Sequence, residues 1–232
     1  TIKSPTTFKK LTFKKEKKMS KVSNLEKYSD RNKRKKKIFE SFNFTAEYED
    51  NITVEIFIEY EKDKKDFEIA EKEALYYSNM FGHMPHFLKI HTDKIYVHKN
   101  IGKDDGVWWV EHNKRAFHIN RSRCKRSNSR YSHCTVVLAH ELAHVLQQLT
   151  GVISPSKWMT ARKLDKKKYC SKYAKTNARE DFAESVVCWI AARHKSDQIS
   201  KSDLAKINEF IPNRLKFFDE MNFDMYPIVS RV

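Results

Sequence analysis

Hydrophobic and polar residues alternate in the first half of the chain and follow a helical period in the second half. Apolar side chains stand at every second position from Ile52 to Tyr60, which predicts a half-buried strand. A helix is predicted to follow, capped by Asp66 and stopped by Gly82. The helix is expected over 67–80, short β-rich segments at 87–91, 95–98, 107–111 and 115–120, and a loop at 100–106.

The period becomes that of a helix from residue 135 onward. Helices are predicted at 135–149, 177–193 and 202–211, and Gly151 and Pro212 end the first and the last of them. A strand-rich first half followed by a helical second half predicts an α+β domain. We expect a basic, disordered tail over 1–40 and one domain over 41–232, in which 41–150 form a small twisted sheet and the helix with the candidate site, and 151–232 are helical.

The composition suits a globular protein, and the charge is unevenly distributed. Hydrophobic residues make up 40% of the 232 positions, and no apolar run reaches the roughly 18 residues that cross a bilayer. The formal net charge is +16, of which residues 1–37 carry +12, since they hold 15 Lys or Arg and 3 Asp or Glu. The remaining residues carry 16 − 12 = +4. We therefore expect contact with nucleic acid, if any, only through the tail.

Two basic segments have alternative interpretations. The densest run, at 31–37, predicts solvated disorder, and a nuclear-import or anion-binding role is the alternative. The arginines and lysine between 121 and 130 lie in a serine-rich loop just before the helix at 135–149. An exposed loop is the simpler interpretation, and a preference for acidic substrate segments is the other.

The pentapeptide His140-Glu141-Leu142-Ala143-His144 carries the most informative chemistry. Two histidines four apart on a helix lie about 40° apart in azimuth, so both imidazoles can reach one ion. Glu141 then lies near the water of an open zinc position, where its carboxylate can take a proton. The alternative is a chance match in a chain with ten histidines. Apolar neighbours predict a buried helix, in which unpaired polar groups would be costly without a metal.

A catalytic zinc site needs a third protein ligand. The extended pattern with Gly and then His after the second histidine is absent, because Gln147 and Thr150 stand at those positions. Glu180 and Glu184 share one face of the helix predicted at 177–193, among apolar residues. One carboxylate can bind the ion while the other accepts the distal N–H of a ligating histidine, and an exposed acidic face is the alternative.

The segment from Tyr173 to Glu184 resembles the one that completes the zinc site in the catalytic domain of anthrax lethal factor. The shared pattern is Tyr, then Thr-Asn, then Glu-x-Phe-Ala-Glu. It follows an upstream HExxH, and the Pro-Pro endopeptidases of the same superfamily share the arrangement. The resemblance covers about 135–192, and more loosely 50–220 as a fold. Ala143 departs from the glycine that many relatives carry before the second histidine.

This resemblance implies a zincin-like metallopeptidase of the gluzincin type with one Zn²⁺ per chain. It implies that Glu180 is the third zinc ligand beside His140 and His144. Glu184 would be the hydrogen-bond partner of a ligating histidine, and Tyr173 would help to stabilise the tetrahedral intermediate. It also implies a protein that is secreted or delivered into a host cell, although an intracellular location stays open.

A peptide substrate needs a surface along which to bind. Zincin peptidases place an edge strand before the catalytic helix, and the strand near Arg115–Ile119, after Trp108 and Trp109, is a candidate for it. A core hairpin is an equally good interpretation of this segment. We expect a protein or peptide partner and no membrane span.

Four cysteines leave the redox compartment open. Cys124 and Cys134 would close a short loop in an exported protein, whereas four free thiols, which we favour, would suit a cytosol. Cys188 continues the face of Glu180 and Glu184, and we interpret it as a small buried residue and not as a ligand.

The sequence as a whole predicts a zinc-dependent endopeptidase. In this hypothesis Glu141 and Tyr173 are catalytic, and His140, His144 and Glu180 bind the metal. The alternative is a catalytically silent zinc-binding protein whose basic tail binds nucleic acid or another polyanion.

Overall fold

A computed structural model describes residues 5–13, 20–22, 39–59, 65–98, 108–110, 115–120, 128–149 and 151–231. These residues form a mixed α+β structure, so the predicted fold class is confirmed at that level. The strands are β1 (Phe8–Phe13), β2 (Ser20–Val22), β3 (Phe39–Tyr48), β4 (Thr53–Glu59), β5 (Lys94–His98), β6 (Trp108–Val110) and β7 (Ala116–Asn120). The α-helices are α1 (Lys65–Gly82), α2 (His86–Lys89), α3 (Asn128–Gln148), α4 (Pro155–Leu164), α5 (Ala178–His194), α6 (Lys201–Phe210) and α7 (Pro212–Asp219). Short 3₁₀ helices are η2 (Tyr173–Lys175) and η3 (Ser196–Gln198).

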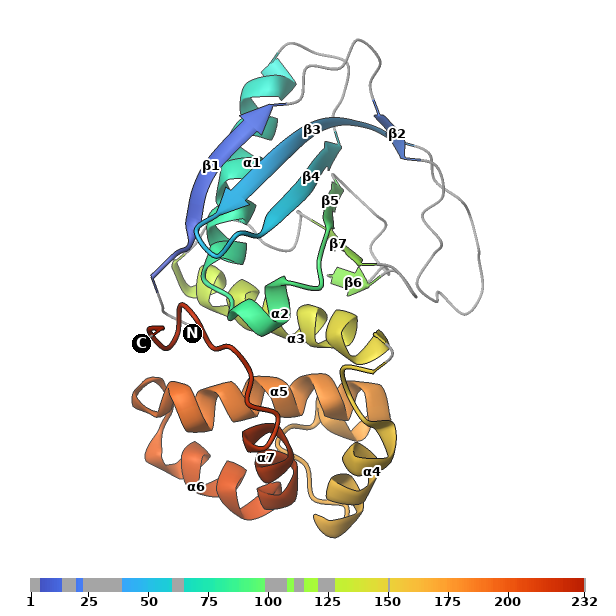
Figure 1. Ribbon diagram of the computed structural model, residues 1–232, viewed down its shortest axis with the longest axis vertical. Coiled ribbons are helices and arrows are strands. Elements are labelled where there is room, and N and C mark those ends of the chain that lie inside the picture. The colour runs from blue at the N-terminus through green and yellow to red at the C-terminus, as the bar shows by residue number, and fades with distance from the viewer. Residues whose placement is uncertain are drawn as a thin grey trace.

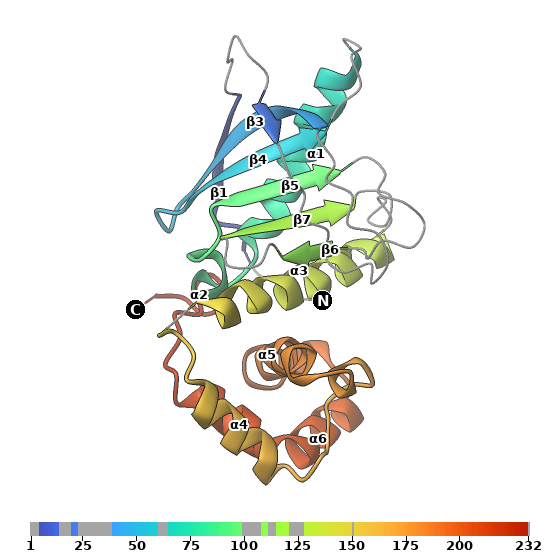
Figure 2. The same cartoon turned by 90° about the vertical axis from the view of Figure 1, so that its right-hand side faces the viewer.

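The described strands form one sheet in the order β1-β3-β4-β5-β7-β6, with β2 pairing with β3 (Figures 1 and 2). β4, β5 and β7 are parallel neighbours, and the other pairs are antiparallel. The predicted alternation holds in β4, where Val54, Ile56 and Ile58 are buried in the main core. Tyr60, at the end of the predicted strand, lies outside the described residues.

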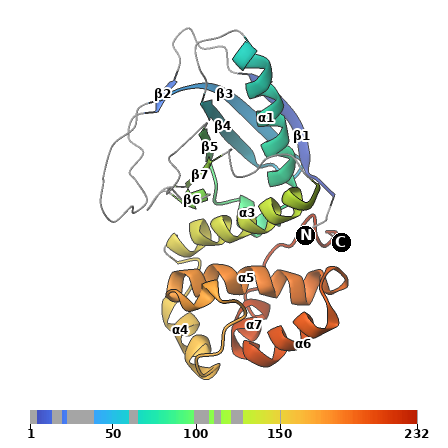
Figure 3. The same ribbon diagram turned by 180° about the vertical axis from the view of Figure 1, so that it is seen from behind.

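Helix α1 covers one face of the sheet, as seen from behind in Figure 3. Its predicted inner face is confirmed, because Ala70, Ala74 and Tyr77 are buried. The helix begins at Lys65, so Asp66 lies inside it and is not its cap. It ends at Gly82, where a Cβ would lie 2.9 Å from the backbone nitrogen of Phe8, so only glycine allows the chain to pass this closely.

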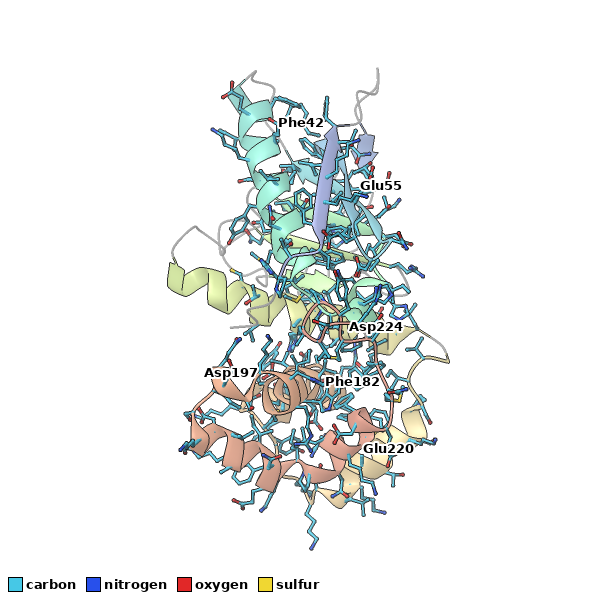
Figure 4. The ribbon with its side chains drawn as sticks, turned by 60° about the vertical axis from the view of Figure 1, so that its left-hand side comes forward. Phe42, Glu55, Phe182, Asp197, Glu220 and Asp224 are labelled. Atoms are coloured by element: carbon cyan, nitrogen blue, oxygen red, sulfur yellow. The ribbon has the colours of Figure 1, made fainter. Side chains whose placement is uncertain are left out.

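Helix α3 lies between the sheet and the C-terminal helices in all three ribbon views (Figures 1 to 3). It contacts β6 and β7 on one side and α5 on the other. Helices α4, α6 and α7 lie on the side of α5 that faces away from α3 (Figures 1 and 3). Phe182 of α5 is fully buried among these helices (Figure 4) and packs edge-on against Trp158 and Phe218, at 5.1 and 5.5 Å between ring centroids. Two helices of the domain thus lie face to face at its centre.

The prediction of a disordered tail over 1–40 is wrong for its first strand. β1 pairs with β3 from Phe8 to Phe13, and Phe13 packs against Phe67 of α1 at 4.7 Å between ring centroids. The lysines between the apolar residues of β1 hide this pattern, because the Lys side chains point to solvent while Phe8, Leu11 and Phe13 pack on the core. The basic run at 31–37 lies outside the described residues.

The segment predicted to be β-rich at 87–91 is not a strand. Residues 87–89 belong to α2 and 90–91 form a turn, because a short, mostly apolar segment does not by its pattern alone distinguish a buried strand from a buried helical turn. The backbone N–H of His86 and of Phe87 donate to the carbonyls of Tyr226 and Asp224, which satisfies the first turn of the helix. The remaining predicted helices and strands are present, although their first and last residues differ from the predicted ones. Helices α4 and α7 were not predicted. The predicted loop at 100–106 lies outside the described residues.

A fully buried arginine ties three of the C-terminal helices together. Arg214 of α7 donates to Asp165, at the end of α4, and to Asp181 of α5, each at 2.9 Å. Arg162 adds a second donor to Asp181 at 2.6 Å. Because Asp181 follows Glu180 directly, this network of Arg214, Asp165 and Asp181 fixes α5 at the point where it enters the candidate site.

Arg214→Ala should lower the free energy of unfolding by about 3–5 kcal/mol, since it leaves two buried carboxylates without their main partner. The matched control is Lys216→Ala on the same helix, whose side chain is exposed and lies 3.9 Å from Glu220. The control should change stability by less than about 0.5 kcal/mol. Urea unfolding followed by tryptophan fluorescence measures both, and equal stability of the two variants would contradict the role given to Arg214.

Candidate metal centre

The HExxH pentapeptide lies in the C-terminal half of α3, on the side that faces α5. The side chains of His140 and His144 are 9% and 5% exposed, so both imidazoles are out of bulk water. Burial of this part of the helix follows from its sequence, because most of the residues around the two histidines are apolar. These are Leu138, Ala139, Leu142, Ala143, Val145 and Leu146, all buried in the main core.

Three ligand atoms converge between α3 and α5. The Nε2 atoms of His140 and His144 lie 3.1 Å apart, and each lies 3.0–3.1 Å from the same oxygen, Oε2 of Glu180. The side chain of Glu180 is 8% exposed. The structure therefore brings the three predicted ligands together, although forty positions separate His140 from Glu180 in the sequence. Together they form a group that can hold a metal ion.

The donor set fits a cation better than it fits hydrogen bonds alone. His140 donates from Nδ1 to Glu184, so in the neutral ring Nε2 carries a lone pair and faces an acidic oxygen at 3.0 Å. Without a cation, His140 must carry a second proton to avoid this repulsion. Tetrahedral zinc, bound at about 2.0–2.2 Å, holds its N and O ligands about 3.3 Å apart, close to the spacing found.

Glu184 fixes the orientation of one candidate ligand. Its Oε1 accepts from His140 Nδ1 at 2.8 Å, one helical turn beyond Glu180 on α5. A histidine that binds a metal through one nitrogen commonly donates from the other to a carboxylate, which sets the tautomer and the ring plane. Nδ1 of His144 is buried and has no hydrogen-bond partner within the part of the chain that the structure describes.

Glu141 and Tyr173 flank this cluster. Glu141 is half-buried and follows His140 on α3. The Tyr173 ring lies 5.7 Å from the His140 ring between centroids, and Tyr173 is 55% exposed. Tyr173 stands in η2, just before α5, so its ring comes from the side of the C-terminal helices. Both predicted catalytic residues thus lie beside the three candidate ligands.

The buried charges of the cluster shift one another's pKa values. Burial alone would lower the pKa of His140, but hydrogen bonds to Glu180 and Glu184 outweigh it and raise this pKa to about 9. Burial opposes ionisation of both glutamates, yet hydrogen bonds from the histidines hold the pKa of Glu180 and of Glu184 below their usual range. Burial raises the pKa of Glu141, against the field of the two histidines. Glu141 is thereby the weaker acid among these carboxyl groups and the better proton acceptor.

Two further residues position the cluster and were not assigned roles from the sequence. Asn177 caps α5, and its Oδ1 accepts from the backbone N–H of Arg179 and Glu180 at 2.9 and 3.0 Å. Ser171 stands close enough to Glu184 to help lower the pKa of that carboxyl, and its Oγ accepts from the N–H of Ala174 at 3.0 Å. Asn three positions before Glu is a capping signal that is visible in the sequence. The serine has no comparable signal, because its contact depends on how the segment folds back on α5.

The predicted edge strand near Arg115–Ile119 is not at an edge. It forms β7, which pairs with β5 on one side and with β6 on the other, so its backbone groups are already bonded. The core-hairpin interpretation was the better one, because β6 and β7 pair antiparallel. Within the described strands, β6 ends this side of the sheet and contacts α3.

The preference for four free thiols is wrong for one cysteine. Cys134 is disulfide-bonded, whereas Cys170 and Cys188 are free thiols. Cys188 is half-buried beside the candidate site and lies one turn beyond Glu184.

Comparison with protein-family models, with curated proteins and with solved structures finds no match to this chain. Among the described helices, none has the length and apolar character needed to cross a membrane. The geometry of the site itself therefore carries the functional argument.

The raised pKa of His140 predicts how the metal-free protein responds to pH. The folded state binds this proton more tightly than the unfolded state, so its stabilisation is complete below about pH 6.5 and is lost as pH rises through about 9. Urea midpoints of the chelator-treated protein should fall across this range. His140→Gln should flatten that fall, and a wild-type midpoint that stays constant would contradict the prediction.

Metal affinity should depend on the hydrogen bond that orients His140. Glu184→Ala should weaken binding of Zn²⁺ by about 10–100-fold, and Glu180→Ala should weaken it further because it removes a ligand atom. Competition with a chromophoric chelator measures both. Glu209→Ala is the matched control on α6, where the side chain is 65% exposed and pairs with Lys168. Equal affinity of wild type and Glu184→Ala would contradict the role of Glu184.

Proposed function

We propose that this chain is a zinc-dependent endopeptidase with a zincin-like fold of the gluzincin type. The observation that carries the proposal is the convergence of His140, His144 and Glu180, backed by Glu184 and flanked by Glu141. The resemblance of 173–184 to the lethal-factor group supports it independently, since that pattern assigns the same residues to the same roles.

The donor set favours zinc. Two imidazole nitrogens and one carboxylate oxygen suit Zn²⁺, whereas calcium and magnesium prefer shells made of oxygen atoms. Sites with three protein ligands are typical of catalytic zinc, which leaves a fourth position for water or substrate. When bound, zinc supplies a Lewis acid that polarises a carbonyl and acidifies water.

Glu141 is the proposed general base and then the general acid. Its raised pKa brings the carboxylate closer to the working pH, so it can take a proton from water and later deliver it to the leaving amine. His140 cannot do this work, because both of its nitrogens are engaged. Glu180 and Glu184 are poor proton acceptors, since their pKa values are lowered.

Tyr173 is the proposed oxyanion donor. Its ring lies beside His140, and Tyr173 is more than half exposed, so its hydroxyl can reach a bound substrate from the side of η2. The hydrogen bond from the backbone N–H of Ala174 to Oγ of Ser171 holds the turn that carries it.

The substrate is proposed to be a protein or peptide in extended conformation. We place it along β6 and not along β7, because β6 lies at the end of the described sheet and contacts the helix that carries Glu141. The disulfide at Cys134 is compatible with the export that the resemblance implies, since disulfides persist in oxidising compartments.

Glu141→Gln should lower kcat for peptide cleavage by roughly 10²–10⁴-fold, because it removes the proton acceptor and keeps the shape of the side chain. Zinc content should stay near one ion per chain. Cleavage of an internally quenched peptide library, with and without a chelator, measures activity, and Glu209→Gln is the exposed control. Unchanged cleavage in Glu141→Gln would overturn the proposal. Stoichiometric zinc without cleavage of any peptide by the wild type would favour the zinc-binding protein instead.

A further inference from the structure

Strand β1 lies at the end of the sheet opposite to β6. It pairs with β3 on one side, and no described strand pairs with it on the other (Figure 1). In an antiparallel ladder every second residue directs its backbone N–H and C=O away from the partner strand. A β-bulge interrupts the register between Phe8 and Lys10, so Lys10–Phe13 is the regular part of this edge. This stretch can accept a further strand.

A groove lies beside this edge, between β1 and α1. Its volume is about 220 Å³, and it is lined by Leu11, Phe13, Phe44, Glu71, Lys72 and Leu75. Phe44 is fully buried, Leu11 and Phe13 are half-buried, and Leu75 of α1 is 44% exposed. The apolar wall of the groove therefore continues from the core out to the solvent.

The groove lies on the face of the sheet that α1 covers. Leu11 and Phe13 pair with Ala46 and Phe44, which belong to the main core, so their side chains point toward α1. A strand added beyond β1 would place every second side chain on this same face. Those side chains would cover Leu75 and fill the groove. Backbone hydrogen-bonding groups and an apolar hollow thus stand together at this edge, which is how sheets bind extended peptides.

The other face of β1 is basic. Lys9 and Lys10 are exposed, and Lys10 pairs with Glu47 of β3, which alternates with the buried Ala46 and Tyr48 and so points away from the core. An acidic residue placed beside Lys10 by an added strand would form a favourable cross-strand pair. On the groove side, the charges of the two lining residues from α1 that are ionised have opposite signs and offset each other. The charge preference of this edge therefore comes from the lysines of β1.

Charge distinguishes the possible occupants of the groove. A second copy of the chain, paired through its own β1, would bring lysines against lysines, and edge lysines oppose such pairing. Residues 1–37 carry a net charge of +12, so the neighbouring parts of this chain are also repelled by Lys9 and Lys10. A segment of another protein that alternates apolar and acidic residues satisfies both faces of the edge.

We propose that the edge of β1 and the groove between β1 and α1 bind an extended segment of a partner protein in which apolar residues alternate with acidic ones. The segment adds to the sheet beside Lys10–Phe13, its apolar side chains enter the groove, and an acidic side chain lies beside Lys10. This edge is at the opposite end of the sheet from β6, where the substrate is placed, so the proposal does not depend on the peptidase function.

Binding of a short fluorescein-labelled peptide in which valine alternates with glutamate tests the proposal. The full chain carries Glu141→Gln in this experiment, so that the probe stays intact if the chain cleaves peptides, and fluorescence anisotropy measures affinity. Leu75→Ser should weaken binding by about tenfold, because it removes a large apolar contact from the groove. Ile69→Ser is the matched control, since Ile69 stands on the same helix, is 49% exposed and does not line the groove. It should leave the affinity unchanged.

Two further measurements test the charge preference and the mode of binding. A probe in which lysine replaces glutamate should bind at least about fivefold more weakly, and Lys10→Glu should bind this lysine probe more tightly than the chain with Lys10 does. Amide hydrogen exchange at Lys10–Phe13 should slow when the glutamate probe binds, because the outward N–H groups of β1 become hydrogen-bonded.

Several outcomes would overturn the proposal. Absence of binding of the glutamate probe, or equal affinity of Leu75→Ser and Ile69→Ser for it, would remove the groove as the binding site. Unchanged exchange at Lys10–Phe13 in the bound state would rule out addition to the sheet. Equal affinity for the two probes would refute the acidic partner. A dimer in sedimentation experiments that Leu75→Ser abolishes would assign the groove to a second copy of the chain instead.

Discussion

The contact between α3 and α5 is the interaction on which the rest of the site depends. It takes two imidazoles and two carboxylates largely out of water, which would be unfavourable for any of them alone. The cost is offset because opposite charges and hydrogen bonds meet there, and a bound cation would offset it further. The sheet positions α3 from one side and the C-terminal helices position α5 from the other. Most of the domain thus serves to hold two helices face to face.

Much of this site could be predicted from the sequence because its parts are local. Residues four apart on a helix share one face, so His140 with His144, and Glu180 with Glu184, follow from spacing alone. The need of zinc for a third ligand then connects the two helices without any knowledge of their packing. The structure meets the condition that this reasoning sets, because His140, His144 and Glu180 lie together.

The parts that could not be predicted depend on pairing between distant segments. β1 becomes a strand because β3 offers it a partner, with paired residues 31 (Phe13 and Phe44) to 40 (Phe8 and Tyr48) positions apart, and no local pattern encodes this pairing. Whether β7 is an edge strand depends on whether β6 pairs with it. The sequence of one strand alone therefore does not show whether that strand lies at the edge of the sheet. The approach of the Tyr173 ring to His140 similarly requires the path of the segment between α4 and α5. Local periodicity carries no information about any of these contacts.

The network of Arg214, Asp165 and Asp181 also constrains how this sequence can change over evolutionary time. Arg214 offsets the charges of both aspartates inside the protein, so a substitution at one position leaves a buried charge that is no longer fully offset. Substitutions at these three positions should therefore occur together in evolution, two or three at a time, and not singly. Homologues that keep Glu180 in place should therefore carry either the whole triad or an apolar replacement of all of it. The triad is a covariation signature that is independent of the residues that carry the chemistry.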